Sequence, residues 1–530
     1  MTAVTIRLPE LRHVAPTMVG IVGTLALWQL AATLFASLHV VPSPLAVALQ
    51  LWADRGIYPL NAATTLREAL LGYAIGNLAA ILLASLFVEL AIVERLVLKL
   101  AIASYCVPLV AIAPILVAVL PGDGPKVTLA ALAVFFTTLV ATVLGLRSMD
   151  GVHLDLIRAA GGGAWRVFRM VRVPGALPSL FAGLRIAAPA ALLGAVIGEY
   201  LGASEGLGVA LIEAQSSFEV ERTWGVALVM SGLAGLLYAV ASFAGGLLTP
   251  WVGREAMVGL GTIAARGGQG GGMRRAIAAA IFFLASVGLT IAFWYGLVHL
   301  LKLDGFFAKT PLDVWHYLAT GDEAVTHRSE ILTALQVTLL DAGSGYLAGT
   351  AVAILVAVVM AIIPAVEQAI MPAAIVLRSI PVVAMAPLIA LTFGRGLLGV
   401  VVVVGIVTFF PTLVHLIAGL RSAPDRACEV ILSFGGSRVM VARKVRLLYA
   451  LPALFAAARI AVPAAIGGAT LAEWLSTGAG MGNLLVLAYA ASRFGTLWAA
   501  SVVIVSLSVA FYAAIGIVEG AVFRRYGGAV

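Results

Sequence analysis

Long apolar runs separated by short charged stretches recur from one end of the chain to the other. A run of roughly 20 residues crosses about 30 Å of hydrocarbon as an α-helix. The runs are continuous and rich in Ala, Leu, Val and Gly, whereas the strands of a membrane barrel alternate over about 10 residues. The pattern predicts an all-α polytopic membrane protein with about 12 transmembrane helices, near residues 17–38, 69–93, 96–120, 127–146, 179–198, 223–249, 276–300, 342–366, 370–393, 397–420, 451–472 and 497–519.

The first run has two interpretations. Arg7 and Arg12 precede it, as basic residues precede the apolar core of a signal peptide. That core usually spans only about 7–15 residues, fewer than this run. An equivalent run follows Arg274 and Arg275 in mid-chain, where a signal would have no use. We therefore expect the first run to remain as a helix.

Composition and charge agree with a membrane protein. Of the 530 residues, 62% are hydrophobic and 11% are charged, whereas about a quarter of a soluble domain is charged. The net charge of +8 would suit nucleic acid, but the basic residues gather at the ends of the apolar runs, so we expect no such partner. Cys106 and Cys428 form neither a disulfide framework nor a metal-binding pair.

The distribution of Lys and Arg orients the chain by the positive-inside rule. Two basic clusters, from Arg147 to Arg185 and from Arg421 to Arg459, fall on the same side of the membrane as both termini. We therefore expect a multi-pass protein of the inner (plasma) membrane with cytoplasmic N- and C-termini.

The two halves of the chain repeat one another. From residue 155 onward the repeat has an offset of 274 positions. Closer to the N-terminus the offset is 273, since Thr65-Leu66 and Gly72-Tyr73 recur as Thr338-Leu339 and Gly345-Tyr346. Six helices per copy is an even number, so the copies are parallel and related by an axis along the membrane normal. The glycine-rich stretch 266–275 is a linker by composition and predicts domains at 1–265 and 276–530. Pairs that differ by 274 positions are Asp155/Glu429, Gly161/Gly435, Pro178/Pro452, Arg185/Arg459, Pro189/Pro463, Glu199/Glu473, Gly206/Gly480, Gly208/Gly482, Trp224/Trp498 and Tyr238/Tyr512.

Enzymatic motifs are missing from the sequence. It has no phosphate-binding G-x-x-x-x-G-K-[ST] loop and no H-E-x-x-H, and its seven histidines are scattered. We therefore expect no catalytic residues, no metal and no cofactor. The glycines of Gly206-Leu-Gly208 and Gly480-Met-Gly482 are similar to a fragment of a nucleotide-binding loop, but a tight turn explains them better.

One cytoplasmic loop of each half has an ordered pattern. Between the fourth and fifth predicted helices, 155–178 and 429–452 both show a short helix, a glycine break and a basic amphipathic segment that ends at a proline. A basic surface on anionic lipid headgroups would explain one such loop. Its repetition at fixed spacing favours a docking element.

These loops resemble the EAA loop of the permeases of binding-protein-dependent ABC importers. The acidic residue, the glycine six positions later and the following Leu-Pro carry the resemblance. Other motifs are similar to the nitrate/sulfonate/taurine branch of that family, namely Pro108-Leu-Val-Ala-Ile-Ala-Pro114, Arg378-Ser-Ile-Pro381-Val-Val-Ala-Met-Ala-Pro387, Phe393-Gly-Arg-Gly396 and Phe409-Phe-Pro411.

The resemblance implies a type I ABC importer fold in which the two permease copies are fused. Its partners would be two ABC ATPase subunits at the cytoplasmic face and a substrate-binding protein outside. The first loop departs from the family pattern by having Asp for Glu, and the second by having Val430-Ile431 for alanines and Leu448 where Pro174 matches. The implied coupling residues are Asp155, Ala159, Gly161, Pro178, Glu429, Gly435 and Pro452.

Charged residues within the apolar runs are further candidates, because a charge at the bilayer centre costs at least about 2.5–3.5 kcal/mol. Glu199 and Glu473 end the fifth run of each copy. They either line or gate the translocation pathway, or they bind the N–H groups of the following turn. Arg378 either meets an anionic substrate or anchors the cytoplasmic end of its helix.

The predicted function is that of the transmembrane subunit of an ABC importer. The resemblance implies a small solute, such as the anions nitrate, sulfonate or taurine. A secondary transporter with six helices in each half is the alternative, but only a short turn, Val93-Glu94-Arg95, stands where that class carries its basic loop. A membrane-bound enzyme is a third candidate without a convergent acid, base or metal site.

Overall fold

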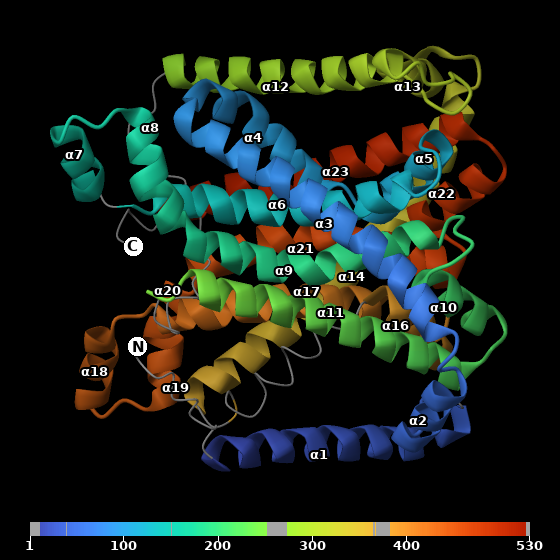
Figure 1. The fold of residues 1–530 in the computed structure, drawn as a ribbon, viewed down its shortest axis with the longest axis horizontal. Coiled ribbons are helices and arrows are strands. Elements are labelled where there is room, and N and C mark those ends of the chain that lie inside the picture. Colours follow the sequence, from blue (N-terminus) through green and yellow to red (C-terminus); the bar gives the residue numbers. More distant parts are fainter. Residues whose placement is uncertain are drawn as a thin grey trace, which may run out of the picture.

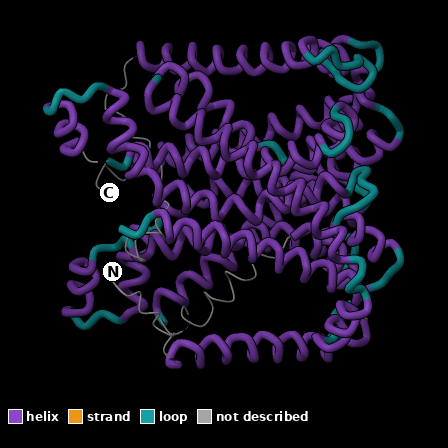
Figure 2. The backbone as a smooth tube through the Cα atoms, viewed as in Figure 1, coloured by secondary structure: helices purple, strands orange, loops and turns teal. Residues whose placement is uncertain are grey.

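The computed structural model describes residues 11–38, 40–149, 151–251, 273–363, 366 and 382–525. Within these ranges all regular elements are helical, which confirms the all-α prediction. Figure 1 shows the long helices side by side, with short helices at both ends of the bundle. Figure 2 shows that the loops gather at the same two ends. The loop pair around α7 and α18 marks one end, and α2, α10, α13 and α22 mark the other.

The helices of the two copies follow the same order along the chain. The first copy comprises α1 Leu11–Leu34, α2 Pro44–Ala53, α3 Tyr58–Glu89, α4 Ala91–Cys106, α5 Leu109–Val119, α6 Gly124–Arg147, α7 Gly151–Ala159, α8 Ala164–Val167, α9 Val173–Glu199, α10 Leu207–Ser216 and α11 Val220–Leu248. The second comprises α12 Met273–Leu300, α13 Pro311–Trp315, α14 Ala324–Ile362, α16 Val382–Phe393, α17 Leu397–Arg421, α18 Asp425–Ser433, α19 Arg438–Val441, α20 Leu447–Tyr449, α21 Leu451–Ala472, α22 Gly480–Ala490 and α23 Phe494–Arg525. Single π-helical turns lie at Phe168–Arg172, His316–Thr320, Ala442–Arg446 and Glu473–Thr477, and a 3₁₀ turn at Ala36–Leu38.

Eight helices among the described residues are long and apolar enough to cross a membrane. They are four equivalent helices from each copy. Shorter apolar helices, including α5 and parts of α1 and α12, accompany them. The eight are α3, α6, Ala164–Glu199, α11, α14, α17, Leu451–Leu475 and α23.

The predicted continuous helix over 96–120 is wrong. The chain forms α4 and α5 instead, separated at Val107 and Pro108. Pro108 lacks an N–H and forces the preceding residue out of the helical region, and Val107 has ψ 116°. Two α-helices of 16 and 11 residues therefore replace one membrane span.

The predicted boundaries also differ at the second span of each copy. The span expected at 69–93 is α3, which starts eleven residues earlier and ends at Glu89, and the span expected at 342–366 is α14, which starts at Ala324. Polar residues in the added turns concealed these starts. Of the span expected at 370–393, only α16 falls within the described residues.

Stacked tryptophans hold the first helix of each copy to its last helix. The rings of Trp28 and Trp224 stack with centroids 5.5 Å apart, and those of Trp294 and Trp498 stack at 5.4 Å. Each indole N–H donates to a backbone carbonyl in the segment that follows the first helix. The repetition of this contact shows the duplication at the level of side chains.

The two copies also contact one another directly. α12 of the second copy packs on α4 of the first, where the Ser286 hydroxyl donates to the Leu96 carbonyl at 2.9 Å. The Tyr105 hydroxyl donates to the Ile460 carbonyl at 3.1 Å, and the Ser501 hydroxyl donates to the Ala111 carbonyl at 3.0 Å. α4 and α5 thus connect the first copy to the helices of the second.

Glycines four residues apart let α3 approach α6 and let α14 approach α17. A Cβ atom on Gly349 would lie 2.6 Å from the Gly405 carbonyl oxygen, whereas one on Gly343, six residues earlier on α14, would meet nothing within 4 Å. Small residues at this spacing are typical of close helix pairs in membranes.

We expect Gly349→Ala to lower the free energy of unfolding by about 1–3 kcal/mol, because the added methyl overpacks the α14–α17 contact. Gly343→Ala, on the same helix, is expected to raise it by about 0.5–1 kcal/mol. Denaturant titration of the purified chain in detergent, followed by tryptophan fluorescence, measures both values. Equal effects of the two substitutions would contradict the close contact.

Candidate functional site

The two predicted coupling loops have the same backbone geometry. α7 ends at a left-handed glycine, Gly161, and α18 ends at Gly435, both with φ +78°. After Gly161, the N–H of Gly162 donates to the Ile157 carbonyl at 2.8 Å, and Gly436 repeats this bond in the second copy. This is the C-cap geometry that glycine adopts without steric cost. The glycine break predicted in each loop is therefore a helix-ending turn.

This geometry, shared by the two copies, leaves apolar side chains exposed at the same end of the molecule. In the first loop Trp165 is 71% exposed, and in the second Phe434 is 89% exposed. Val152, Leu156, Val430 and Val439 are also exposed beside them. Isolated apolar side chains are common on surfaces, whereas contiguous exposed apolar clusters are typical of interaction sites.

The acidic residues and prolines of the loops lie in different settings. Asp155 is exposed and pairs with Arg158 at 3.2 Å on α7, and Glu429 and Ala159 are exposed as well. Pro178 lies inside α9 and Pro452 in the first turn of α21. In the first copy the basic segment continues through a π-helical turn into α9, past Pro178. In the second copy the segment ends with α20 at Tyr449, and α21 begins at Leu451, directly before Pro452.

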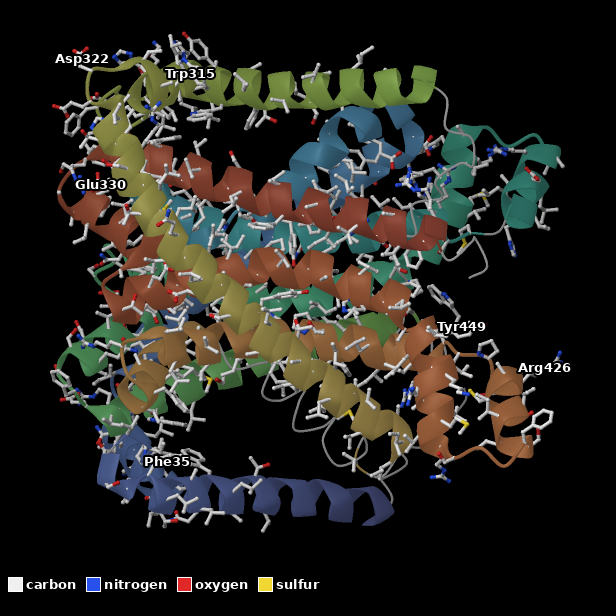
Figure 3. The ribbon with its side chains drawn as sticks, turned by 180° about the vertical axis from the view of Figure 1, so that it is seen from behind. Phe35, Trp315, Asp322, Glu330, Arg426 and Tyr449 are labelled. Carbon is white, nitrogen blue, oxygen red and sulfur yellow. The ribbon has the colours of Figure 1, made fainter. Side chains whose placement is uncertain are left out.

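The second loop is the better packed of the two. Cys428 on α18 is buried against Ala423 and Val441, whereas α7 buries none of its residues. Figure 3 shows α18, with Arg426 labelled, projecting at the end of the molecule opposite to Asp322. The two loops, which depart from the family pattern at different positions, thus also differ in packing.

Glu199 lies at the opposite end of the bundle from the loops and is 1% exposed. One carboxylate oxygen accepts the Gly208 N–H at 2.6 Å, and the other accepts the Thr65 hydroxyl at 2.6 Å. The Thr65 oxygen in turn accepts the Leu207 N–H at 2.9 Å. Two of the unpaired N–H groups that begin α10 are thereby satisfied.

Glu473 makes the equivalent contacts in the second copy and is fully buried. Its carboxylate accepts the Gly482 N–H and the Thr338 hydroxyl, both at 2.9 Å. The Thr338 oxygen accepts the Met481 N–H at 2.8 Å. We call each of these arrangements a Glu–Thr clamp, formed by Glu199 with Thr65 and by Glu473 with Thr338.

Glycines make room for both clamps. Gly206 and Gly480 have φ +132° and +82°, and a Cβ atom on Gly208 would lie 2.8 Å from a carboxylate oxygen of Glu199. The G-x-G patterns thus form capped helix starts. These contacts favour the structural interpretation of the two glutamates, and their role in the pathway stays a prediction.

Next to the clamps, the two copies differ in charge. Glu68 lies beside Glu199 and pairs with Lys126 at 2.8 Å, and Lys126 also pairs with Asp123 at 3.0 Å. Asp341 takes the place of Glu68 in the second copy, but the position equivalent to Lys126 is the buried Val400. In the first copy, Lys126 thus places a positive charge beside the buried acids Glu68 and Glu199. The second copy has no counterpart of this lysine.

A second ion pair joins Asp54, which lies outside the eight membrane-spanning helices, to Arg222 in the first turn of α11. The Arg222 guanidinium donates to the Asp54 carboxylate at 2.8 and 3.0 Å, and these hydrogen bonds hold the pKa of Asp54 below its usual range. Arg222 also pairs with Glu219. The Asp54–Arg222 pair ties the end of α2 to α11, at the end of the bundle away from the α7 and α18 loops.

Sequence reasoning missed the residues that complete the clamps. Thr65 and Thr338 were visible as members of the repeat, but a threonine in an apolar run gives no sign of the glutamate it meets more than 130 positions later. Lys126 and Glu68 were missed for the same reason. Arg378 and most of the 266–275 linker lie outside the described residues.

Comparisons with known proteins identify the family. Residues 76–254 and 345–526 both match the family described as "Binding-protein-dependent transport system inner membrane component". The chain is 34% identical over 221 residues to a probable ABC transporter permease of Haemophilus influenzae, which covers 41% of this chain and 90% of that protein. No solved structure matches.

Two further relatives are named for what they transport. A formylaminopyrimidine transport permease of Halalkalibacterium halodurans is 31% identical over 229 residues, 43% of this chain and 92% of its own length. A riboflavin transport system permease of Chloroflexus aurantiacus is 30% identical over 260 residues, 47% of this chain and 97% of its own. Each relative is thus about one copy long, and because both halves match the family, this chain belongs to the binding-protein-dependent ABC transporter permeases and carries two permease domains in tandem.

Proposed function

We propose that this chain alone forms the transmembrane part of an ABC importer, with the translocation pathway between its two copies. ATP is hydrolysed by two separate ATPase subunits, one bound at α7–α8 and one at α18–α19. A substrate-binding protein delivers solute at the opposite face. The observation that carries the proposal is the repeated, exposed apolar loop, which suits insertion of a short helix into a groove on a partner.

Charge supports the orientation. The two loops carry most of the basic residues that follow α6 and α17, which places them and both termini in the cytoplasm by the positive-inside rule. The ends of α9 and α21 then face the outside. The domain boundary at 266–275 remains part of the proposal, since the family matches end and begin well away from it.

The substrate is a small solute. The family branch suggested by the sequence takes up anions such as nitrate, sulfonate and taurine, while two relatives are named for formylaminopyrimidine and riboflavin. These nitrogen heterocycles join the anions as the first ligands to test against the binding protein.

Reconstitution tests the function. In liposomes, the chain with its ATPases and binding protein is expected to accumulate solute only when ATP is supplied. Transport by the chain alone, driven by an ion gradient, would instead support the secondary transporter.

The coupling turns give a sharper test. Replacing Gly161 and Gly435 by valine places a β-branched residue at φ +78°, which costs at least about 1–2 kcal/mol per position. We expect the affinity for the ATPases to fall about tenfold or more, measured by pull-down from detergent.

Gly163→Val is the matched control for this test. Gly163 lies in the same turn at φ −74°, and a Cβ atom there meets nothing within 4 Å. ATPase binding is expected to be unchanged. If the Gly161→Val/Gly435→Val chain bound the ATPases normally, these loops would not be the coupling elements.

A further inference from the structure

Two equivalent aromatic residues of the copies meet at the end of the bundle away from the coupling loops. Tyr200 follows Glu199, and Trp474 follows Glu473, 274 positions later. Their rings touch edge to face with centroids 5.8 Å apart. In a molecule with two related halves, a residue and its counterpart are separated by twice their distance from the axis. Tyr200 and Trp474 therefore lie beside the axis between the copies.

Neighbouring apolar residues extend this contact where α9 ends. Ile197, in the last turn of α9, and Leu201, in the turn that follows the helix, lie three residues before and one after Tyr200. Leu471 and Leu475 flank Trp474 in the same way. These six side chains belong to one hydrophobic cluster that spans both copies. Tyr200 is only 8% exposed, so the cluster closes the axis at this level.

Among the described residues, no hydrogen bond joins the two rings. The Tyr200 hydroxyl is buried and has no hydrogen-bond partner among the described residues. The contact between the copies here consists of apolar packing, which excludes water and ions without a bond that must break before the halves separate.

The Glu–Thr clamps fix each ring to its own copy. Glu199 ties the start of α10 to α3 through Thr65, and Glu473 ties the start of α22 to α14 through Thr338. Tyr200 and Trp474 therefore move with the bodies of their copies. A rigid separation of the halves would part the rings.

We propose that Tyr200 and Trp474, with Ile197, Leu201, Leu471 and Leu475, form the outer gate of the translocation pathway. A pathway between parallel copies follows the axis that relates them, and this cluster closes that axis on the outer side. The inference rests on the proposed function. It adds the residues that the solute must pass and assigns the two glutamates the role of positioning the gate.

Thiol accessibility tests the gate in the complex with its ATPases. In a chain carrying Cys106→Ala and Cys428→Ala, Tyr200→Cys and Trp474→Cys are introduced separately. A membrane-impermeant maleimide is applied from the outside, first without nucleotide and then after trapping with ATP and vanadate. Since a closed gate leaves the open state as a minor population, we expect labelling to be at least about tenfold faster in one state than in the other.

Two control thiols give the labelling rates expected of an exposed and of a buried position. Asp322→Cys, on the exposed outer loop seen in Figure 3, should react rapidly in both states. Met230→Cys, in the core of the first copy, should react slowly in both. Equal labelling of Tyr200→Cys in the two states would overturn the gate. If Tyr200→Cys does not fold, Ile197→Cys and Leu201→Cys take its place.

A cross-link tests whether the contact between Tyr200 and Trp474 must open during the transport cycle. In the Tyr200→Cys/Trp474→Cys chain, a short cleavable bifunctional thiol reagent should block vanadate trapping, and cleavage should restore it, while the ATPases stay bound throughout. Normal trapping in the cross-linked complex would overturn the gate and leave the proposed function standing. If the parent chain and every variant failed to bind ATPases, the proposed function itself would be overturned, and the gate with it.

Discussion

Replacing Lys126 by methionine is expected to lower the free energy of unfolding by about 3–5 kcal/mol, because it leaves a buried carboxylate without its counter-charge. Glu68 is buried and pairs with the Lys126 ammonium at 2.8 Å. Methionine has a similar length, so the substitution removes the charge with little change in packing. A denaturant titration in detergent measures the loss.

The companion variant decides whether the charge is the cause. Lys126→Met/Glu68→Gln removes both members of the pair, and replacing a whole buried pair costs far less than breaking it. We expect the double variant to recover most of the stability. If it were as unstable as Lys126→Met alone, the loss would come from packing or from Asp123, the other partner of Lys126.

The second copy supplies a natural comparison. Asp341 occupies the position of Glu68, and Val400 that of Lys126. Asp341 has no ionic partner in the part of the chain that the structure describes. Asp341→Asn is therefore expected to change stability much less than Lys126→Met does.

Glu473→Ala is expected to lower the free energy of unfolding by about 2–4 kcal/mol, since it leaves the buried Gly482 N–H unpaired and opens a cavity beside it. Glu473→Gln keeps one carbonyl oxygen as an acceptor. We expect the glutamine variant to retain most of the stability, and the same titration measures both.

These two variants also separate the two roles that the sequence left open for the glutamate. A residue that only caps α22 should lose transport and stability together in Glu473→Ala and recover both in Glu473→Gln. A glutamate whose charge acts on the solute should lose transport in Glu473→Gln while stability is kept. ATP-driven uptake into liposomes, measured beside the titration, distinguishes these outcomes.

The two loops proposed to bind the ATPases could be located from the sequence because the signals for a helix-ending turn are local. A helix that ends at glycine requires only neighbouring residues, and Gly161 and Gly435, where the sequence predicts a glycine break, both have a left-handed φ of +78°. The break at Pro108 was also within reach, since proline restricts the residue before it. The long apolar run around Pro108 concealed it.

The length of α14 was harder to predict. α14 spans 39 residues and begins with a polar turn, and nothing in that turn is apolar enough to mark a membrane span. Its helical state depends on packing against the neighbouring helices, because propensity alone supports such a segment weakly.

By itself, the amino-acid sequence determined that this protein is helical, has membrane-spanning helices and consists of two tandem copies, because hydrophobic length and repetition are properties of the linear chain. The parallel insertion of the copies and the docking role of one loop in each stay predictions from charge placement and spacing. Only the tertiary structure decided which groups meet. Glu199 meets Thr65, Lys126 meets Glu68, and Tyr200 meets Trp474. These contacts join residues far apart in sequence, so they depend on how the helices pack and on where the axis between the copies lies.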